Sequence, residues 1–212
     1  MAVLKTALNL ALEDGYATSD RAWTTKLNPV KDATGRRDCY LDPDQRRALI
    51  AHATLDLAVL IRAMSLLPLR PGAVAALTVG NFDKRLGVLV IGKDKAGQDR
   101  KITLAPSTTA FFAEQARDKL PAAPLCARGN GMAWNKDSWK CPFKDAVLAA
   151  KLPASATAYA LRHSTITDLI ALHRLDTMTV SQLSGTSITM IERHYGHLLR
   201  GHAAMAVASL AL

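Results

Sequence analysis

The sequence predicts a mostly helical α/β protein that carries one small antiparallel β-sheet. Apolar residues recur at helical spacing through most of the chain, and two short β-rich runs, 87–92 and 100–106, flank a turn that contains Gly97. The composition is 49% hydrophobic and 21% charged over 212 residues, which is ordinary for a globular chain that buries one sizeable core. We therefore expect a multi-helix fold with a single β-hairpin.

The first 38 residues are predicted to be separate from the rest. Apolar residues at helical spacing predict a helix from residue 2 to Gly15, with no sequence neighbour to pack against. The polar stretch 17–38 contains Pro29 and Gly35 and is typical of a linker. We expect residues 1–38 to be the last helix of a preceding domain plus a linker, and residues 39–212 to form the main domain.

The main domain begins with a strong helix signal. Asp42 can cap a helix, Pro43 suits its first position, and Gln45 is placed to complete a capping box. An apolar helix follows at 56–70, a short helix begins after Pro71, and the two β-rich runs form the hairpin. Further helices are expected at 107–120, 137–152, 157–172, 177–185 and 187–197.

The charge balance favours a polyanionic partner. Lys and Arg number 27 against 18 Asp and Glu, which gives a net charge of +9, and the pI is near 9.7. Nucleic acid is the first partner to consider at this charge, and a basic but solvated surface is the alternative. No apolar run reaches the length of a membrane span and no signal peptide is evident, so we expect a cytoplasmic protein.

Cysteine usage predicts no metal site. Cys39, Cys126 and Cys141 are widely separated, with neither a CxxC pair nor a Cys/His spacing suited to zinc. We expect free, buried thiols in a reducing compartment.

One tyrosine near the end of the chain stands out. Tyr195 lies in MIERHYGHL, residues 190–198, with histidines on both sides. Its hydroxyl is a poor nucleophile at neutral pH, because the unperturbed pKa of tyrosine is about 10. Arg70 and Arg162 could stabilise a phosphoryl group under attack, and a lysine of the hairpin turn, Lys93 or Lys95, could serve a leaving oxygen.

The order of these residues resembles the catalytic domain of the tyrosine recombinase (phage integrase) family. The resemblance rests on four motifs and covers about residues 38–200. The motifs are LRPGAVAAL, DKAGQDRKITL, YALRHS and GTSITMIERHYGH. It implies that Tyr195 attacks a DNA phosphate, forming a 3′-phosphotyrosyl bond and releasing a 5′-hydroxyl. It implies that Arg70 and Arg162 hold that phosphate, that Lys95 is the hairpin lysine with Lys93 as the alternative, and that neither cofactor nor metal is required.

The resemblance also implies an assembly. Family members work on double-stranded DNA as a homo-tetramer on two sites, with no small-molecule substrate and no membrane. Residues 1–38 would then be the remnant helix of a core-binding domain, and the chain would bind DNA weakly and with little specificity. The apolar segment 198–212 would dock on a neighbouring copy or fold back on its own core.

Two positions depart from the family's commonest pattern. Tyr159 stands where a histidine is usual, and Thr186 stands where histidine or tryptophan is usual. Each keeps a hydroxyl that can bond a phosphate oxygen, but neither can act as an imidazole near neutral pH. His163 lies one residue beyond Arg162, about 100° further around a helix, and is not assigned to the missing position. The departures fit an active subgroup better than a degenerate enzyme, because the family's other four site residues are all present: Arg70, Lys95, Arg162 and Tyr195.

Several residues have a plain structural alternative. Arg70 could bond carbonyls at a helix end, Tyr159 could be a core tyrosine, and Thr186 could cap the helix that carries Tyr195. The remaining candidates are assigned to DNA binding: Lys93, Arg100, Lys101, His163, His194 and His197, with local packing as the alternative for His194 and His197. Other basic residues would contact the DNA backbone or form a solvated surface: Arg36, Arg37, Arg46, Arg47, Lys136, Lys140 and Lys144.

Two other functions compete with site-specific recombination. The first is a DNA-binding accessory protein with a degenerate recombinase fold that cleaves no strand. The second is a type IB topoisomerase, which uses the same chemistry without matched sites. We expect recombination in a bacterial nucleoid-associated or phage-encoded setting.

Overall fold

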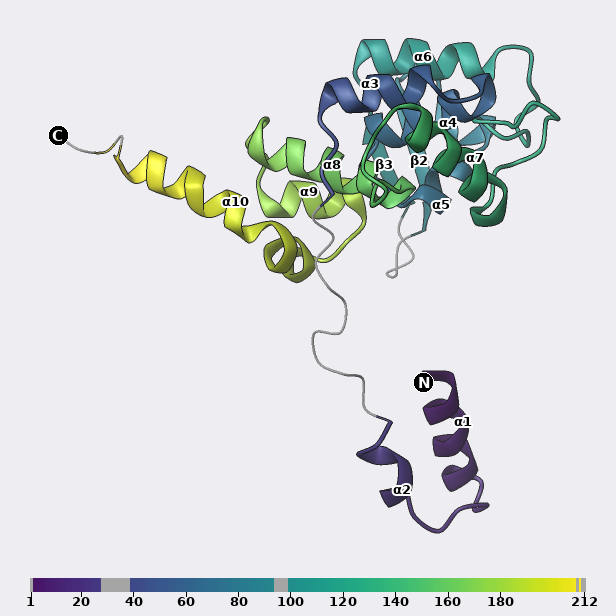
Figure 1. Cartoon of the computed structure of the whole chain (residues 1–212), viewed down its shortest axis with the longest axis vertical. Helices are drawn as coiled ribbons and strands as arrows, with labels where there is room; N and C mark the ends of the chain where they lie inside the picture. Colours follow the sequence, from purple (N-terminus) through teal and green to yellow (C-terminus); the bar gives the residue numbers. More distant parts are fainter. Residues whose placement is uncertain (1, 28–38, 94–98, 209, 211–212) are drawn as a thin grey trace. The chain divides into compact units, whose positions relative to one another are not determined.

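The computed structural model describes residues 2–27, 39–93, 99–208 and 210, and the chain divides into two units, Met1–Arg36 and Arg37–Leu212 (Figure 1). Each unit is treated by itself. No helix in the described ranges is both long enough and apolar enough to cross a membrane.

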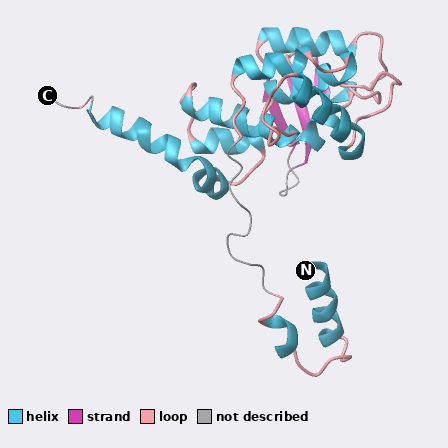
Figure 2. Ribbon diagram, viewed as in Figure 1, coloured by secondary structure: helices cyan, strands magenta, loops and turns pink. Residues whose placement is uncertain are grey.

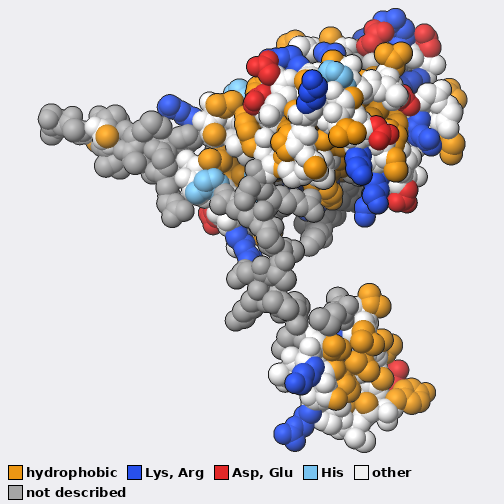
Figure 3. Space-filling model, in the orientation of Figure 1, with side chains coloured by type: hydrophobic (Ala, Val, Ile, Leu, Met, Phe, Trp, Pro, Cys, Tyr) orange, Lys and Arg blue, Asp and Glu red, His pale blue; other side chains and the backbone are white. Residues whose placement is uncertain are grey.

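Residues 2–27 of the first unit form two helices where the sequence predicted one. The predicted helix is present as α1, Ala2–Glu13, and a short helix α2, Arg21–Thr24, follows it. Trp23 of α2 is buried, and its indole N–H donates to the Asn9 side-chain oxygen at 2.8 Å. The linker prediction is therefore wrong at α2, and its part at 28–38 lies outside the described residues. Figure 3 shows apolar side chains on the surface of this unit. Val3 and Tyr16 are both exposed.

The second unit is mostly helical with one small sheet, as the sequence predicted (Figure 2). Before the sheet come α3 (Pro43–Ala51), α4 (Leu55–Leu66), α5 (Pro71–Ala75) and a 3-10 turn at Val79–Asn81. The strands are β1 (Phe82–Asp83), β2 (Val88–Lys93) and β3 (Asp99–Thr103). After the sheet come α6 (Pro106–Ala116), α7 (Lys136–Ala149), α8 (Ala158–Ala171), α9 (Thr177–Ser184) and α10 (Ile188–Ala208).

The sheet is antiparallel with strand order β1-β2-β3. Leu89 pairs with Ile102 in the predicted hairpin, and the register shifts between Ile91 and Lys93 near the turn. β1 was not predicted, because a two-residue strand has no periodicity to detect. The hairpin turn at 94–98, with the predicted Lys95, lies outside the described residues.

The N-terminus of α3 is fixed by the predicted capping box. The Asp42 carboxylate accepts from the Gln45 backbone N–H at 2.8 Å, and the Gln45 side-chain oxygen accepts from the Asp42 N–H at 3.0 Å. We expect Asp42→Ala to lower the free energy of unfolding by about 1 kcal/mol, since the variant leaves a helix donor unsatisfied. A thermal melt should show a decrease of about 2–4 °C. Asp145→Ala, an exposed change inside α7, is the control and should melt close to wild type.

α8 is held by buried polar contacts as well as by apolar packing. Arg46 of α3 forms a buried ion pair with Asp168 of α8, and the Tyr40 hydroxyl donates to the same carboxylate at 2.8 Å. Burial and then this hydrogen bond raise the pKa of Tyr40 above its usual value. These contacts fix α8 against the first helix of the unit.

Two apolar clusters stabilise the second unit. The larger gathers side chains from α3 to the start of α8, with Phe112 and Leu161 fully buried. The smaller joins α8, α9 and α10, which lie together in Figure 1, through Ile166, Ile170, Val180, Ile191 and Tyr195. The predicted nucleophile is therefore packed on one side by its own helix bundle.

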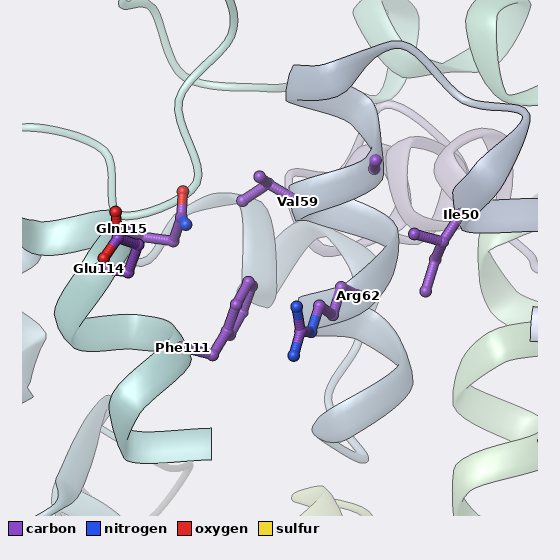
Figure 4. Close-up of a pocket in the computed structure, with 7 residues that line it drawn as sticks. Ile50, Val59, Arg62, Phe111, Glu114 and Gln115 are labelled. Atoms are coloured by element: carbon purple, nitrogen blue, oxygen red, sulfur yellow. The ribbon is translucent and has the colours of Figure 1, made fainter. Parts of the chain in front are cut away.

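A cavity of about 260 Å³ lies where α3, α4 and α6 meet (Figure 4). The Arg62 guanidinium lies 4.7 Å from the ring centre of Phe111, and Val59 and Ile50 complete the apolar wall. None of the predicted site residues lines this cavity, so it does not bear on the site below.

The cysteines differ in part from the prediction. All three are free thiols, but only Cys126 is fully buried, and burial raises its pKa to about 12. Cys39 is half-buried and Cys141 is exposed on α7, so the expectation of buried thiols is wrong for Cys141.

Candidate active site

Arg162 is buried at the centre of the candidate site. It lies in the second turn of α8, with 9% of its surface exposed. Its Nη1 donates to the Pro68 carbonyl at 2.5 Å and to the Ser184 carbonyl at 3.1 Å. The side chain therefore joins the loop before α5 to the end of α9, and it presents a guanidinium with five N–H donors to that junction.

Arg70 reaches the same junction from the other side. It precedes Pro71 as the N-cap residue of α5, its side chain is exposed, and its Nη1 donates to the Gly185 carbonyl at 3.2 Å. Arg70 therefore makes the bond that was its structural alternative, a bond to a carbonyl at a helix end, because Gly185 caps the C-terminus of α9. An exposed guanidinium can hold this bond and still meet a phosphate.

Gly185 is required where these arginines meet. Its φ of +62° is a left-handed conformation that glycine adopts without strain. A Cβ at this position would lie 1.4 Å from Nη1 of Arg100, so the guanidinium of Arg100 lies against Gly185 and would have to shift if a side chain were present. The turn 184–185 therefore contacts Arg70, Arg100 and Arg162.

The arginines form a concentrated positive charge. Burial, followed by the charge of Arg70, lowers the pKa of Arg162 to about 10, with Arg100 acting in the same direction and Tyr195 and Tyr159 opposing it. This pKa is still well above 7, so Arg162 remains a cation at neutral pH. Because burial and like charges disfavour the cation, an anion bound beside it would be stabilised strongly.

Tyr195 of α10 contacts His163, the residue that follows Arg162 on α8. The Tyr195 side chain is 8% exposed, and its hydroxyl oxygen lies 3.0 Å from Nδ1 of His163. The two rings stack, with centroids 5.2 Å apart and planes 28° apart. The sequence assigned His163 to DNA binding and did not pair it with Tyr195, because the pairing depends on how α10 packs against α8.

Tyr159 is not in the core and Thr186 does not cap a helix, which were their structural alternatives. Tyr159 is 46% exposed in the first turn of α8, so it is not a core tyrosine. Ser187, and not Thr186, precedes α10, and its hydroxyl accepts from the Met190 N–H at 3.4 Å. The capping prediction for Thr186 is therefore wrong, while its carbonyl accepts from the Ser181 hydroxyl at 2.6 Å. Phosphate contact by either residue stays a prediction.

The DNA-binding candidates are spread over the sheet and α10. Lys93 ends β2, and Lys101 is exposed on β3. His194 is half-buried and His197 is exposed on α10. Arg100 differs from its exposed neighbour Lys101. It lies two residues before the buried Ile102, so both side chains are on the inward face of the strand. That alternation is the sequence signal that could have placed Arg100 in the site.

Comparison with known proteins shows a likeness of structure and not of sequence. No protein-family model matches this sequence, and no curated protein matches it. The integrase of transposon Tn1549, solved with transposon right-end DNA, matches with a TM-score of 0.74 and 19% identity over 99% of this chain and 77% of that chain.

Two phage integrases match as well. A lambda integrase dimer bound to a COC′ core site has a TM-score of 0.69 and 16% identity, over 91% of this chain and 57% of that chain. The catalytic domain of bacteriophage HP1 integrase has a TM-score of 0.56 and 19% identity, over 80% of this chain and 94% of that chain. The chain has the integrase catalytic-domain fold, and the fold predicted from the motif order is confirmed.

Proposed function

We propose that this chain, which has the fold of integrase catalytic domains, breaks and rejoins double-stranded DNA through a 3′-phosphotyrosyl intermediate on Tyr195. The observation that carries the proposal is the convergence of separate segments on one turn. Arg70, Arg162 and Arg100 meet at residues 184–185, and Tyr195 contacts His163, the residue that follows Arg162 on α8. A nucleophile beside clustered guanidinium groups is the arrangement that phosphoryl transfer requires.

The chemistry follows from these groups. The Tyr195 oxygen attacks the phosphorus as its hydroxyl loses a proton, the P–O5′ bond breaks, and the 5′-oxygen leaves with the bonding electrons and is protonated. The arginines stabilise the charge on the non-bridging oxygens. We assign protonation of the 5′-oxygen to the hairpin lysine, Lys95 or Lys93. Because the phosphotyrosyl ester conserves the energy of the broken ester, rejoining needs no nucleotide.

A basic surface borders the arginine cluster. Lys136, Lys140 and Lys144 repeat every four residues along α7 and are all exposed. They line a cavity of about 450 Å³ together with Tyr159 and with Pro71, the neighbour of Arg70. Cations at this spacing follow one helix face and suit a DNA backbone that leads toward the cluster. This surface supports double-stranded DNA as the partner.

Replacing these three lysines together by glutamine should weaken DNA binding at every sequence. For every phosphate that the variant no longer neutralises, the slope of log affinity against log salt should become shallower by about 0.9. Fluorescence anisotropy with a short duplex over a salt series measures this slope. The control removes three exposed cations elsewhere, Lys84, Arg85 and Arg117, in the same way. Equal slopes in the two triple variants would show that α7 contributes only net charge.

The proposed assembly is a homo-tetramer on two DNA sites. The support is indirect: the lambda structure of this fold is a dimer on a core site, and the Tn1549 integrase was solved with its transposon end. A recombination product that forms only when two matched sites are supplied supports this assembly. Relaxation of supercoiled DNA that has no matched site supports a topoisomerase instead.

The first test of the function needs no known target. The protein is incubated with a library of nicked duplexes of random sequence, in which the short strand beyond the cleavage point diffuses away after attack. After denaturation, protein-linked strands are recovered and sequenced. Recovered adducts that share a sequence support the proposal. Salt-sensitive binding without any adduct would support the rival function, a DNA-binding accessory protein that does not cleave.

A further inference from the structure

We propose that His163 takes the proton from the Tyr195 hydroxyl during strand cleavage and returns it on rejoining; the assignment rests on the proposed function. The carrying observation is the contact of 3.0 Å between Nδ1 and the phenol oxygen, with the rings stacked. This distance is a hydrogen bond, and it is within reach for direct proton transfer.

The tautomer of His163 follows from its role. A neutral imidazole has one protonated nitrogen and one acceptor nitrogen. With the proton on Nε2, Nδ1 accepts the hydrogen bond that the Tyr195 hydroxyl donates. The same nitrogen then receives the proton when Tyr195 attacks, and the resulting imidazolium keeps its contact with the phenolic oxygen.

Other histidines near Tyr195 are less suited to this role. His194 and His197 precede and follow it by one and two positions on α10, and side chains at those spacings do not face each other on a helix. Tyr159 and Thr186 supply hydroxyls with no basicity near neutral pH. His163 reaches Tyr195 because it comes from the neighbouring helix α8, where it follows Arg162 by one position.

The proton transfer is balanced with the bond changes. The Tyr195 O–H bond breaks and its proton moves to Nδ1 of His163, while the freed oxygen pair forms the bond to phosphorus. The P–O5′ bond breaks, and the 5′-oxygen takes a proton from the hairpin lysine. In rejoining, the 5′-hydroxyl gives its proton back to the hairpin lysine as its oxygen attacks phosphorus. The bond between phosphorus and the Tyr195 oxygen breaks, and the His163 imidazolium returns its proton to that oxygen.

Charged and titratable groups lie on most of the helices packed near the His163–Tyr195 contact. On its own helix these are Arg162, Tyr159 and Asp168, the last paired with Arg46, and Arg70 and Arg100 act on Arg162. The charged groups of α4 are engaged elsewhere: Asp56 accepts from the Gly129 N–H, and Arg62 lies over Phe111. Residues Thr177–Ser184 of α9 include no charged side chain. From α10 come Tyr195, half-buried His194, and the exposed Glu192, Arg193 and His197.

The decisive variant is His163→Asn. Asparagine places an oxygen near the position of Nδ1 and so keeps an acceptor for the Tyr195 hydroxyl, but it cannot take the proton. At pH 7 we expect adduct formation to slow by about 10²–10⁴-fold, the usual contribution of a general base. The recovered library sequence, carrying its nick, serves as the substrate. His173→Asn, at an exposed position beyond α8, is the matched control and should react at the wild-type rate.

The pH profile separates proton transfer from positioning. The wild-type rate should rise with pH, because one group must be unprotonated to accept the proton, and then level off. The His163→Asn rate should lack this inflection and keep rising with pH, because more of the attacking phenol is then ionised without a base. A His163→Asn protein that keeps the wild-type pH profile would overturn the proposal. A slowed rate with that profile would leave His163 a positioning role, and a wild-type rate would leave it none.

A second substrate separates the two protons of the reaction. With sulfur replacing the bridging 5′-oxygen, the leaving group is a thiolate that needs no proton. His163→Asn should remain slow on this substrate, because its defect is at the nucleophile. Full recovery of the rate would overturn the proposal by placing His163 on the leaving group. Failure of the wild-type protein itself to form any adduct would overturn the proposed function, and this role with it.

Discussion

Tyr195→Phe is expected to abolish covalent attachment to DNA while leaving binding intact. The change removes one oxygen, the proposed nucleophile, and keeps the ring that packs among Ile166, Ile170 and Ile191. Loss of the hydrogen bond to His163 should reduce the free energy of unfolding by only about 0.5–1.5 kcal/mol. Denaturing gels of the nicked duplex measure attachment, and anisotropy with the same duplex measures binding.

Tyr16→Phe serves as the control for this result. It removes the same atom from an exposed tyrosine of the first unit, so its adduct yield should equal that of wild type. An adduct that persists in Tyr195→Phe would place the nucleophile elsewhere. Duplex binding without an adduct in wild type and variant alike would instead favour the non-cleaving accessory protein.

The sequence was most informative where one pattern repeats over several turns. The long helices were predicted because their apolar periodicity spans many residues, and α3 because Asp42, Pro43 and Gln45 agree on its start. The same reasoning missed α2, whose four residues are stabilised by the contact of Trp23 with Asn9. Such a tertiary contact has no signature in local sequence.

The site residues also fall into those that local sequence predicts and those that depend on tertiary contacts. Arg70, Arg162 and Tyr195 were found as a set from their order along the chain. In the structure Arg70 and Arg162 bond carbonyls of the turn 184–185, while Tyr195 contacts His163. His163 and Arg100 were assigned to DNA binding alone, because their positions depend on helix packing and on Gly185, which leaves room for a guanidinium. Residue type and order were therefore predictable, while mutual contacts were not.

Arg162→Lys is expected to slow cleavage by about 10²–10³-fold, the usual loss when one charge-stabilising donor is removed from a catalytic site. Lysine keeps the positive charge, so DNA affinity should change little. It replaces a planar fork by a point charge, and it cannot bond Pro68 and Ser184 while also gripping a phosphate with paired donors. Single-turnover adduct formation measures the rate, and anisotropy measures affinity. The control, Arg117→Lys, alters an exposed arginine paired with Glu114 and should leave the rate unchanged.

A neutral substrate distinguishes catalysis from support of the fold. If Arg162 stabilises negative charge on a non-bridging oxygen, replacing that oxygen by a methyl group removes the need for the arginine. Arg162→Ala should then regain much of its lost rate on the methylphosphonate duplex, while remaining inactive on the natural phosphate. A variant equally slow on both substrates, with a lowered melting temperature, would show that the two carbonyl bonds are the main role of Arg162. The buried position and the lowered pKa of Arg162 favour the first outcome, because a fold that needed only these bonds could use a neutral donor and avoid burying charge beside Arg70.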